Sequence, residues 1–220
     1  MKVSRDEYVK VLKRKLTDRM FRQECLAEIL DDSPYALWKM SDIEATRIFE
    51  APKLKRIVVA VDPAVTSNEN SDETGIVVCG LGFDNRGYVL EDASMEGATP
   101  EQWGKKAVEM YHKYNADRIV AEKNQGGDMV EVIIRGQGQG IPPVKLVHAS
   151  KGKEIRAEPI AAFYERREVS HVGRFQLLEQ QQTEWDPTGK GKSPDRIDAL
   201  VWGLTELMTK SKVDIRIGYG

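Results

Sequence analysis

The sequence is poor in cysteine and in long apolar runs, and it carries no excess of basic charge. Its two cysteines, Cys25 and Cys79, are too few and too far apart for a disulfide framework or a zinc site, which favours a reducing compartment. No stretch comes near the roughly 20 apolar residues that a membrane-spanning helix needs. The first residues are polar and lack the apolar segment of a signal peptide. We therefore expect a cytoplasmic protein without a membrane partner.

The low net charge also limits how the chain can contact nucleic acid. A value of −2 excludes a surface coated in lysine and arginine, so any such contact must come from a local patch. One patch lies between residues 145 and 174, where seven lysines and arginines stand against four glutamates. Within it, Lys151, Lys153 and Arg156 directly follow a strand-like run and are candidates for holding phosphates.

The length of 220 residues allows one large domain, or a domain of about 150 residues with an extension. Residues 4–30 have apolar side chains at helical spacing, and Asp31-Asp-Ser-Pro34 breaks that run. The first clear strand-like segment begins only near residue 56. We therefore divide the chain into a helical extension, residues 1–54, and a main domain, residues 55–220.

From residue 56 onward, strand-like and helix-like segments follow in a regular order. Three strands come first, separated by polar and glycine-containing loops that are typical of antiparallel neighbours. Strands then alternate with helices, which indicates parallel pairing. The expected strands are 56–62, 74–81, 87–92, 117–122 and 144–148, and the expected helices are 99–114, 126–134, 154–167 and 193–204. This order predicts an α/β fold with a mixed five-stranded sheet flanked by helices.

Two acidic residues stand at the ends of strand-like segments. Asp62 closes the run Ile57-Val-Val-Ala-Val, and Glu122 closes Ile119-Val-Ala. If these strands are parallel neighbours, the two carboxylates lie at adjacent strand ends, about 4.8 Å apart across the ladder. Because like charges repel at that distance, either one carboxylate is protonated or a metal is present.

A third acidic position opens the last long helix. Ser193 is a good N-cap and Pro194 suits the first helical position, while Asp195 and Asp198 share one face at i and i+3. Together with the two strand-end acids, they could hold one or two divalent cations for phosphodiester hydrolysis. Asp72, in the polar loop after the first strand, either adds a further carboxylate or belongs to a solvated hairpin loop.

Four motifs follow one another along the main domain: Val59-Ala-Val-Asp62 with Asp72-x-Thr-Gly, Ile119-Val-Ala-Glu122, Lys151-x-Lys153-x-x-Arg156, and Ser193-Pro-Asp195-Arg-Ile-Asp198. In this order they resemble the nuclease domain of the tailed-bacteriophage terminase large subunit. The resemblance spans roughly residues 55–208. It implies an RNase H-like fold and a two-metal site for Mg²⁺ or Mn²⁺. It also implies endonucleolytic cutting of concatemeric phage DNA during genome packaging, in the cytoplasm of a bacterial host.

The resemblance also assigns roles by motif position. Asp62, Glu122 and Asp195 would be the metal ligands, and Asp198 would be a fourth catalytic residue close behind them. Asp72 and Lys153 would be auxiliary residues of the site. Related sequences often carry an adjacent acidic pair where this chain has Asp195-Arg196, which leaves open whether Asp195 or Asp198 is the direct ligand.

Full-length proteins of that family also carry an N-terminal ATPase motor, and this chain departs from the pattern. Asp186-Pro-Thr-Gly-Lys-Gly-Lys-Ser193 ends like a phosphate loop, but Asp186 stands where the first glycine is required. Residues 1–50 look like the stretch that leads from the motor to the nuclease, so the motor is either a separate chain or missing. The expected partners are double-stranded DNA, a terminase small subunit, a portal protein and such a motor.

Two other readings stay open. The same fold and acids also suit a junction resolvase or an RNase H-type nuclease. Alternatively, the chain is a non-catalytic packaging-assembly module that docks on portal or small-subunit partners through its terminal segments.

Overall fold

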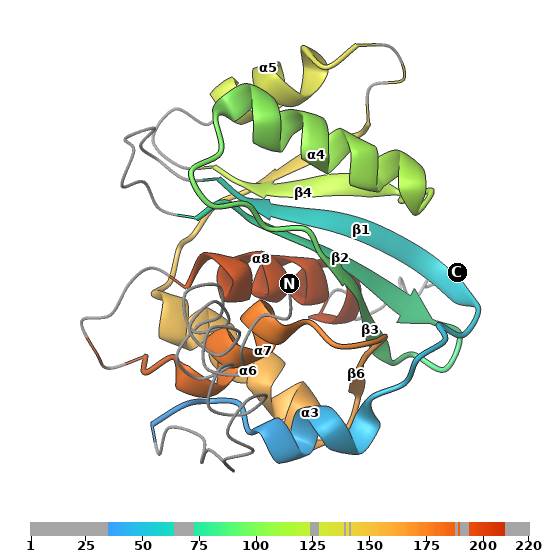
Figure 1. Ribbon diagram of the computed structural model, residues 1–220, viewed down its shortest axis with the longest axis vertical. Helices are drawn as coiled ribbons and strands as arrows, with labels where there is room; N and C mark the ends of the chain where they lie inside the picture. The colour runs from blue at the N-terminus through green and yellow to red at the C-terminus, as the bar shows by residue number, and fades with distance from the viewer. Residues whose placement is uncertain are drawn as a thin grey trace, which may run out of the picture. The chain divides into compact units, whose positions relative to one another are not determined.

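The computed structural model describes residues 35–63, 73–123, 128–138, 140, 142–187, 189 and 194–209. The chain groups into two compact units, residues 1–33 and 34–220, and every element described below belongs to the second. Figure 1 shows this unit as a central sheet with helices on both faces. None of the helices in the described ranges is both long and apolar enough to cross a membrane.

The sheet has six strands in the order β5-β4-β1-β2-β3-β6. β1 pairs antiparallel with β2 and β2 with β3, whereas β1 with β4, β4 with β5, and β3 with β6 are parallel. This confirms the mixed sheet and the parallel neighbours that the sequence predicts. The strands are β1 (Leu54–Asp62), β2 (Gly75–Gly82), β3 (Gly87–Asp92), β4 (Arg118–Glu122), β5 (Val144–Val147) and β6 (Val169–His171).

The predicted number of strands, five, is wrong by one, because β6 was not foreseen. This strand is only three residues long, too short to show the alternation that marks a strand. It pairs with the edge of β3, and Val169, Ser170 and His171 are all buried. Tertiary contact, rather than local pattern, makes these residues a strand.

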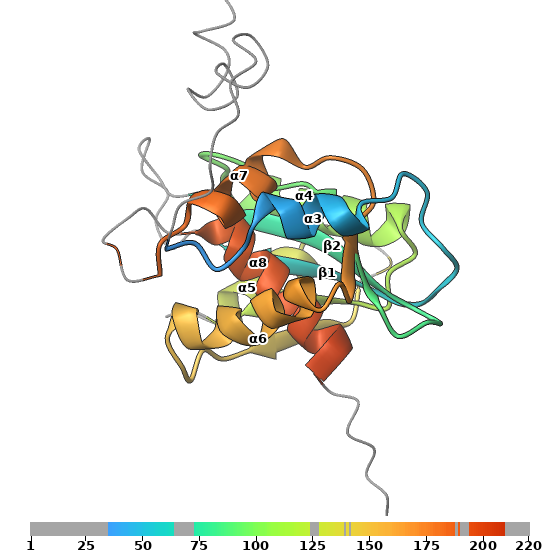
Figure 2. The same cartoon turned by 90° about the horizontal axis from the view of Figure 1, so that it is seen from below.

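Helices cover both faces of the sheet because the strand side chains alternate between them. Val59 and Val61 of β1 pack with α4 and α5, while Val58 and Ala60 pack with the helices of the opposite face. Figure 2 shows α3, α6, α7 and α8 in front of that second face. The helices are α3 (Met40–Thr46), α4 (Pro100–Lys113), α5 (Asp128–Arg135), α6 (Lys153–Glu165), α7 (Gln176–Glu184) and α8 (Asp195–Leu204), and α8 continues as the π-helical turn η1 (Thr205–Thr209).

The start of α4 forms a capping box between Thr99 and Gln102. The Gln102 backbone N–H donates to Thr99 Oγ1 at 3.3 Å, and the Thr99 backbone N–H donates to Gln102 Oε1 at 2.8 Å. Two amide groups that the helix itself leaves unpaired are thereby satisfied.

The described part of the predicted extension, residues 35–54, packs on the main domain. Trp38 and Ile43 are fully buried in the cluster that also contains Tyr164 of α6 and Val169 of β6. The helices expected within residues 4–30 lie outside the described residues. The division of the chain at residues 54 and 55 stays a prediction.

Candidate metal centre

β1 and β4 bring the two predicted strand-end acids to the same edge of the sheet. Val61 of β1 pairs in parallel with Ala121 of β4, so Asp62 and Glu122 follow at neighbouring strand ends. Their exposed fractions are 7% and 9%. Two carboxylates are therefore withdrawn from water side by side, as the parallel pairing predicted.

The N-terminus of α8 brings two more acids to this edge. Asp195 and Asp198 occupy the first turn of α8, and both are buried. The helix starts one residue later than predicted. Pro194 has φ −87° and ψ 62° and is the N-cap, so it is not the first helical residue. Its carbonyl accepts from the Asp198 backbone N–H at 2.8 Å. Ser193, the predicted N-cap, lies outside the described residues.

α8 reaches the acids by lying very close to β1 and β2. A Cβ atom on Gly75 of β2 would overlap the carbonyl oxygen of Asp195, and one on Gly203 of α8 would lie 2.8 Å from Cys79 Sγ. Glycine at these two contacts therefore lets the helix backbone approach the sheet. The whole of α8 is buried as a result.

Three carboxylates form a compact group that suits a divalent cation. Asp62, Asp195 and Asp198 each offer one oxygen, and these oxygens lie within 4.8 Å of one another. Burial, followed by repulsion from Asp198 and Glu122, raises the pKa of Asp62 well above its usual range. Burial also raises the pKa of Asp198, against the opposing effect of Lys153. A hard cation with oxygen ligands would offset this concentrated charge, so the donor set fits a hard divalent cation.

Glu122 lies beside this group, held by two donors. Its Oε2 accepts from Trp202 Nε1 at 2.9 Å and from Arg156 Nη1 at 3.4 Å. The Arg156 guanidinium lies 4.5 Å from the centre of the Trp202 ring, and its Nη2 donates to Asp198 Oδ1 at 3.4 Å. Trp202 and Arg156 thus join the strand acid to the helix acid.

Trp202 is the residue of this site that sequence reasoning missed. Trp202 belongs to the buried core cluster, and its indole N–H also reaches Glu122. It stands four residues after Asp198, and that spacing places both side chains on one face of α8. The spacing of four residues from Asp198 was the signal in the sequence that could have placed the indole N–H near the acids.

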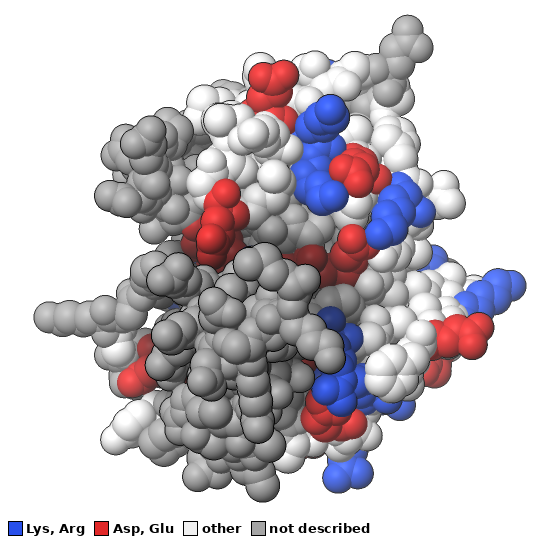
Figure 3. All heavy atoms as spheres, viewed as in Figure 1, with Lys and Arg blue, Asp and Glu red and all other residues white. Residues whose placement is uncertain are grey.

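Two of the three predicted phosphate contacts face the acids. Lys153 Nζ forms an ion pair with Asp198, and Arg156 bridges Glu122 and Asp198. Lys151 is exposed just before α6. On the face drawn in Figure 3, acidic and basic side chains are interspersed. Asp72, the possible additional carboxylate, lies outside the described residues.

Comparison with known proteins agrees with this geometry. The family model for the terminase RNaseH-like domain matches residues 59–207. The chain belongs to this family. None of the curated proteins is a significant match to the sequence.

Solved terminase structures share the fold. The large terminase of the thermophilic bacteriophage D6E aligns with a TM-score of 0.59 and 11% identity, over 94% of this chain and 53% of the D6E chain. The present chain therefore spans about half the length of that protein. The large terminase nuclease of the thermophilic phage G20c aligns with a TM-score of 0.55 and 14% identity, over 78% of this chain and 98% of the G20c chain. The nuclease domain of the large terminase subunit gp2 of bacterial virus Sf6 aligns with a TM-score of 0.58 and 13% identity, over 76% of this chain and 96% of the Sf6 chain.

In this terminase domain, Arg196 faces away from the acid group. Its Nε donates to Glu73 Oε2 at 2.8 Å, and its guanidinium also pairs with Asp92 at the end of β3. The arginine beside Asp195 therefore anchors α8 to β3 and to the segment before β2. Asp195 and Asp198, on the other hand, both contribute to the three-carboxylate group.

Proposed function

We propose that this chain is a divalent-metal-dependent DNA endonuclease that cuts concatemeric phage DNA during genome packaging. The observation that carries the proposal is the group of three buried carboxylates, from β1 and α8, whose oxygens lie within 4.8 Å of one another. Membership of the terminase RNaseH-like family and the fold shared with terminase nucleases support it. The G20c nuclease has been solved with bound magnesium, and a mutant of the Sf6 domain with manganese.

Asp62, Asp195 and Asp198 would hold the first cation, and Glu122, beside Asp62, would help to hold a second. Such cations supply Lewis-acid stabilisation of charge on the phosphate and make water more acidic. The protein holds their ligands on rigid elements, since β1, β4 and α8 are all buried at this point. Well-fixed ligands lower the cost of organising the site.

The basic residues of α6 would bind the DNA phosphate next to the acids. Although burial lowers the pKa of Lys153, its ion pair with Asp198 raises that pKa overall, so the side chain is charged at neutral pH. Arg156 is held against the Trp202 ring and can present its planar guanidinium to phosphate oxygens. Lys151, exposed before the helix, would contact a neighbouring phosphate.

The packaging context is part of the same proposal. The small subunit, the portal protein and an ATPase motor would be partners of this domain. Residues 1–54 would form the connection to such a motor. A panel of duplex, branched and RNA–DNA hybrid substrates distinguishes a terminase-type nuclease from a junction resolvase or an RNase H, since only the first prefers plain duplex DNA.

Plasmid cleavage with Mg²⁺ or Mn²⁺ tests the proposed activity. The variants are Asp62→Asn and Glu122→Gln, with Glu101→Gln as control because Glu101 is an exposed residue of the first turn of α4. We expect cleavage by the parent and the control, and a loss of at least about 100-fold for both site variants. Calorimetric titration with Mn²⁺ gives an independent readout. Equal cleavage by the parent and Asp62→Asn, or no Mn²⁺ binding by the parent, contradicts the proposal.

A further inference from the structure

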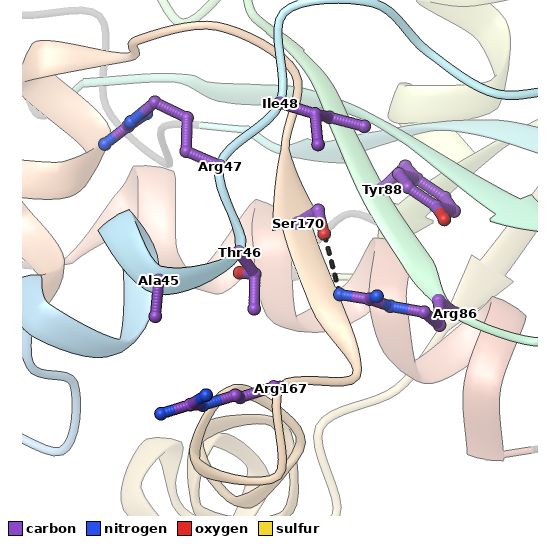
Figure 4. A pocket seen from close by; sticks show the side chains of 8 residues that line it. All are labelled: Ala45, Thr46, Arg47, Ile48, Arg86, Tyr88, Arg167 and Ser170. Carbon is purple, nitrogen blue, oxygen red and sulfur yellow. Dashed lines mark hydrogen bonds between the residues drawn. The ribbon is translucent and has the colours of Figure 1, made fainter.

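A polar cavity lies at the β6 edge of the sheet, the edge opposite to β5. It has a volume of about 330 Å³ and is bordered by the end of α3, the start of β3, the segment after α6, and β6. Figure 4 shows Arg86, Arg167, Thr46 and Ser170 around it. None of these residues takes part in the metal centre.

The backbone brings Arg86 and Arg167 to the same end of the β3–β6 pair. Gly87 of β3 pairs with Val169 of β6, so Arg86, one residue before β3, and Arg167, two residues before β6, line the same cavity. Arg167 adopts φ 59°, and the backbone bonds from Arg167 to Tyr164 and from Glu168 to Phe163 close α6 in a Schellman motif. This position favours glycine, and an arginine there costs local stability. A role for its side chain would explain that cost.

The charges around the cavity are unbalanced. Arg47, the third arginine on its wall, is neutralised by Glu44 and by Glu179, the latter at 2.7 Å. Among the described residues, neither Arg86 nor Arg167 has an ion-pair partner within 4.0 Å. The excess of positive charge therefore belongs to these two side chains.

Arg86 has a buried donor with nothing to bind. Its Nη2 donates to Ser170 Oγ at 3.0 Å, while its Nε is buried and meets no acceptor within the described part of the chain. The carboxylate of the nearby Asp84 is engaged by the Tyr88 hydroxyl at 2.6 Å and by the Arg86 backbone N–H at 3.1 Å. A half-buried guanidinium without an anionic partner is costly, and an anion in the cavity that Arg86 lines would neutralise its charge.

We propose that this cavity binds a phosphate group, held by the guanidinium groups of Arg86 and Arg167 and by the Ser170 hydroxyl. The planar guanidinium suits phosphate because its parallel N–H donors match two phosphate oxygens. The volume leaves room for the rest of a nucleotide, so the phosphate can belong to a free phosphate compound or to a DNA backbone. This site does not depend on the metal centre or on nuclease activity.

Titration of the ¹⁵N-labelled full chain with pyrophosphate, and separately with a short DNA duplex, tests the site without added metal. The readout is the Nε–H resonance of each arginine side chain. We expect saturable shifts for Arg86 and Arg167. In Arg86→Gln and Arg167→Gln, the affinity for the phosphate probe should fall at least about tenfold. Arg135→Gln, which removes one exposed positive charge from α5, is the matched control and should bind as the parent does.

Two further variants keep the result clear. Ser170→Ala leaves both arginines in place and should weaken binding less, which covers the case in which Arg86→Gln does not fold. Asp62→Asn should bind phosphate as the parent does, so a failed nuclease assay does not affect this test. Shifts with the duplex alone assign the site to a DNA backbone, and shifts with pyrophosphate assign it to a free phosphate compound. No shift at Arg86 with either probe, or equal affinity in Arg86→Gln, overturns the proposal.

Discussion

At the scale of single residues, two hydrogen-bond donors, the side chains of Trp202 and Arg156, hold Glu122 in one orientation. Trp202 Nε1 and Arg156 Nη1 both donate to the same oxygen, Oε2. These two hydrogen bonds to Oε2 also fix the position of the other carboxylate oxygen, Oε1. A donor that fixes the orientation of a metal ligand affects cation affinity without touching the cation.

Trp202→Phe tests this positioning. Phenylalanine keeps an aromatic ring under Arg156 and removes the indole N–H together with part of the ring volume. We expect Mn²⁺ affinity to fall about tenfold to 100-fold, as calorimetry would measure. Trp103→Phe is the matched control, because it removes the same ring atoms from a tryptophan that is also buried, in the core on the other face of the sheet. If both variants bind Mn²⁺ as the parent does, Trp202 only fills space.

The roles of individual residues were predictable to different degrees. The meeting of Asp62 and Glu122 follows from two apolar strands that end in an acid, once parallel pairing is assumed. Asp195 and Asp198 are equivalent in the helical pattern, because i and i+3 positions share a face. Only the packing of α8 against β1 shows that both carboxylates approach Asp62.

At the scale of elements, the metal centre depends on how closely α8 approaches the sheet. The contact at Gly75 is the tightest, since any side chain there would meet the backbone of Asp195 rather than a side chain that could move. The close approach is what places an acid of α8 next to the end of β1. Gly75 is therefore a requirement of the site as well as of the core.

Gly75→Ala should displace the start of α8. We expect a loss of stability of about 1–3 kcal/mol or more, the usual cost of overpacking, together with weaker Mn²⁺ binding. Gly152→Ala is the control, because a Cβ at Gly152 meets nothing within 4 Å. Urea unfolding gives the stability, and calorimetry gives the cation affinity. Parent-like values of both for Gly75→Ala would show that the helix can shift without affecting the site.

Most elements were predictable because each shows a local pattern that its tertiary contacts respect. The strands before residue 123 and helices α4, α6 and α8 lie within a few residues of their expected bounds. β6 shows where this fails, since three residues carry no period. The α3 segment also lacks a clear local pattern, because its 7 residues of mixed character form a helix that buries Ile43 and Thr46.

At the scale of the whole molecule, the acid group opposes folding when no cation is present. Burial and repulsion raise the pKa of Asp62 above 3.8, the value of an unperturbed aspartate, so the folded chain binds this proton more tightly than the unfolded chain does. The stability that the protonated Asp62 carboxyl contributes is therefore complete below pH 3.8, and it is lost as the pH rises through the folded-state pKa of Asp62. Above pH 3.8 the unfolded chain releases this proton more readily than the folded chain does, so the buried carboxyl of the cation-free protein opposes folding.

Asp62→Asn should therefore be more stable than the parent at pH 7 in the presence of a chelator, because it removes the carboxyl group whose burial and repulsion oppose folding. Added Mn²⁺ should reverse the order. A cation at 100 times its dissociation constant stabilises the parent by about 2.7 kcal/mol, which corresponds to a rise in melting temperature of about 5–10 °C. Asp62→Asn should gain much less stability from Mn²⁺, and Glu101→Gln should gain as much as the parent.

Near pH 4 the stabilities of the parent and Asp62→Asn should converge without metal, since Asp62 is then protonated in the folded state. Thermal unfolding at the two pH values, with chelator and with Mn²⁺, measures all of these differences. A variant that is less stable than the parent in chelator at pH 7 would mean that Asp62 stabilises the fold itself rather than opposing it.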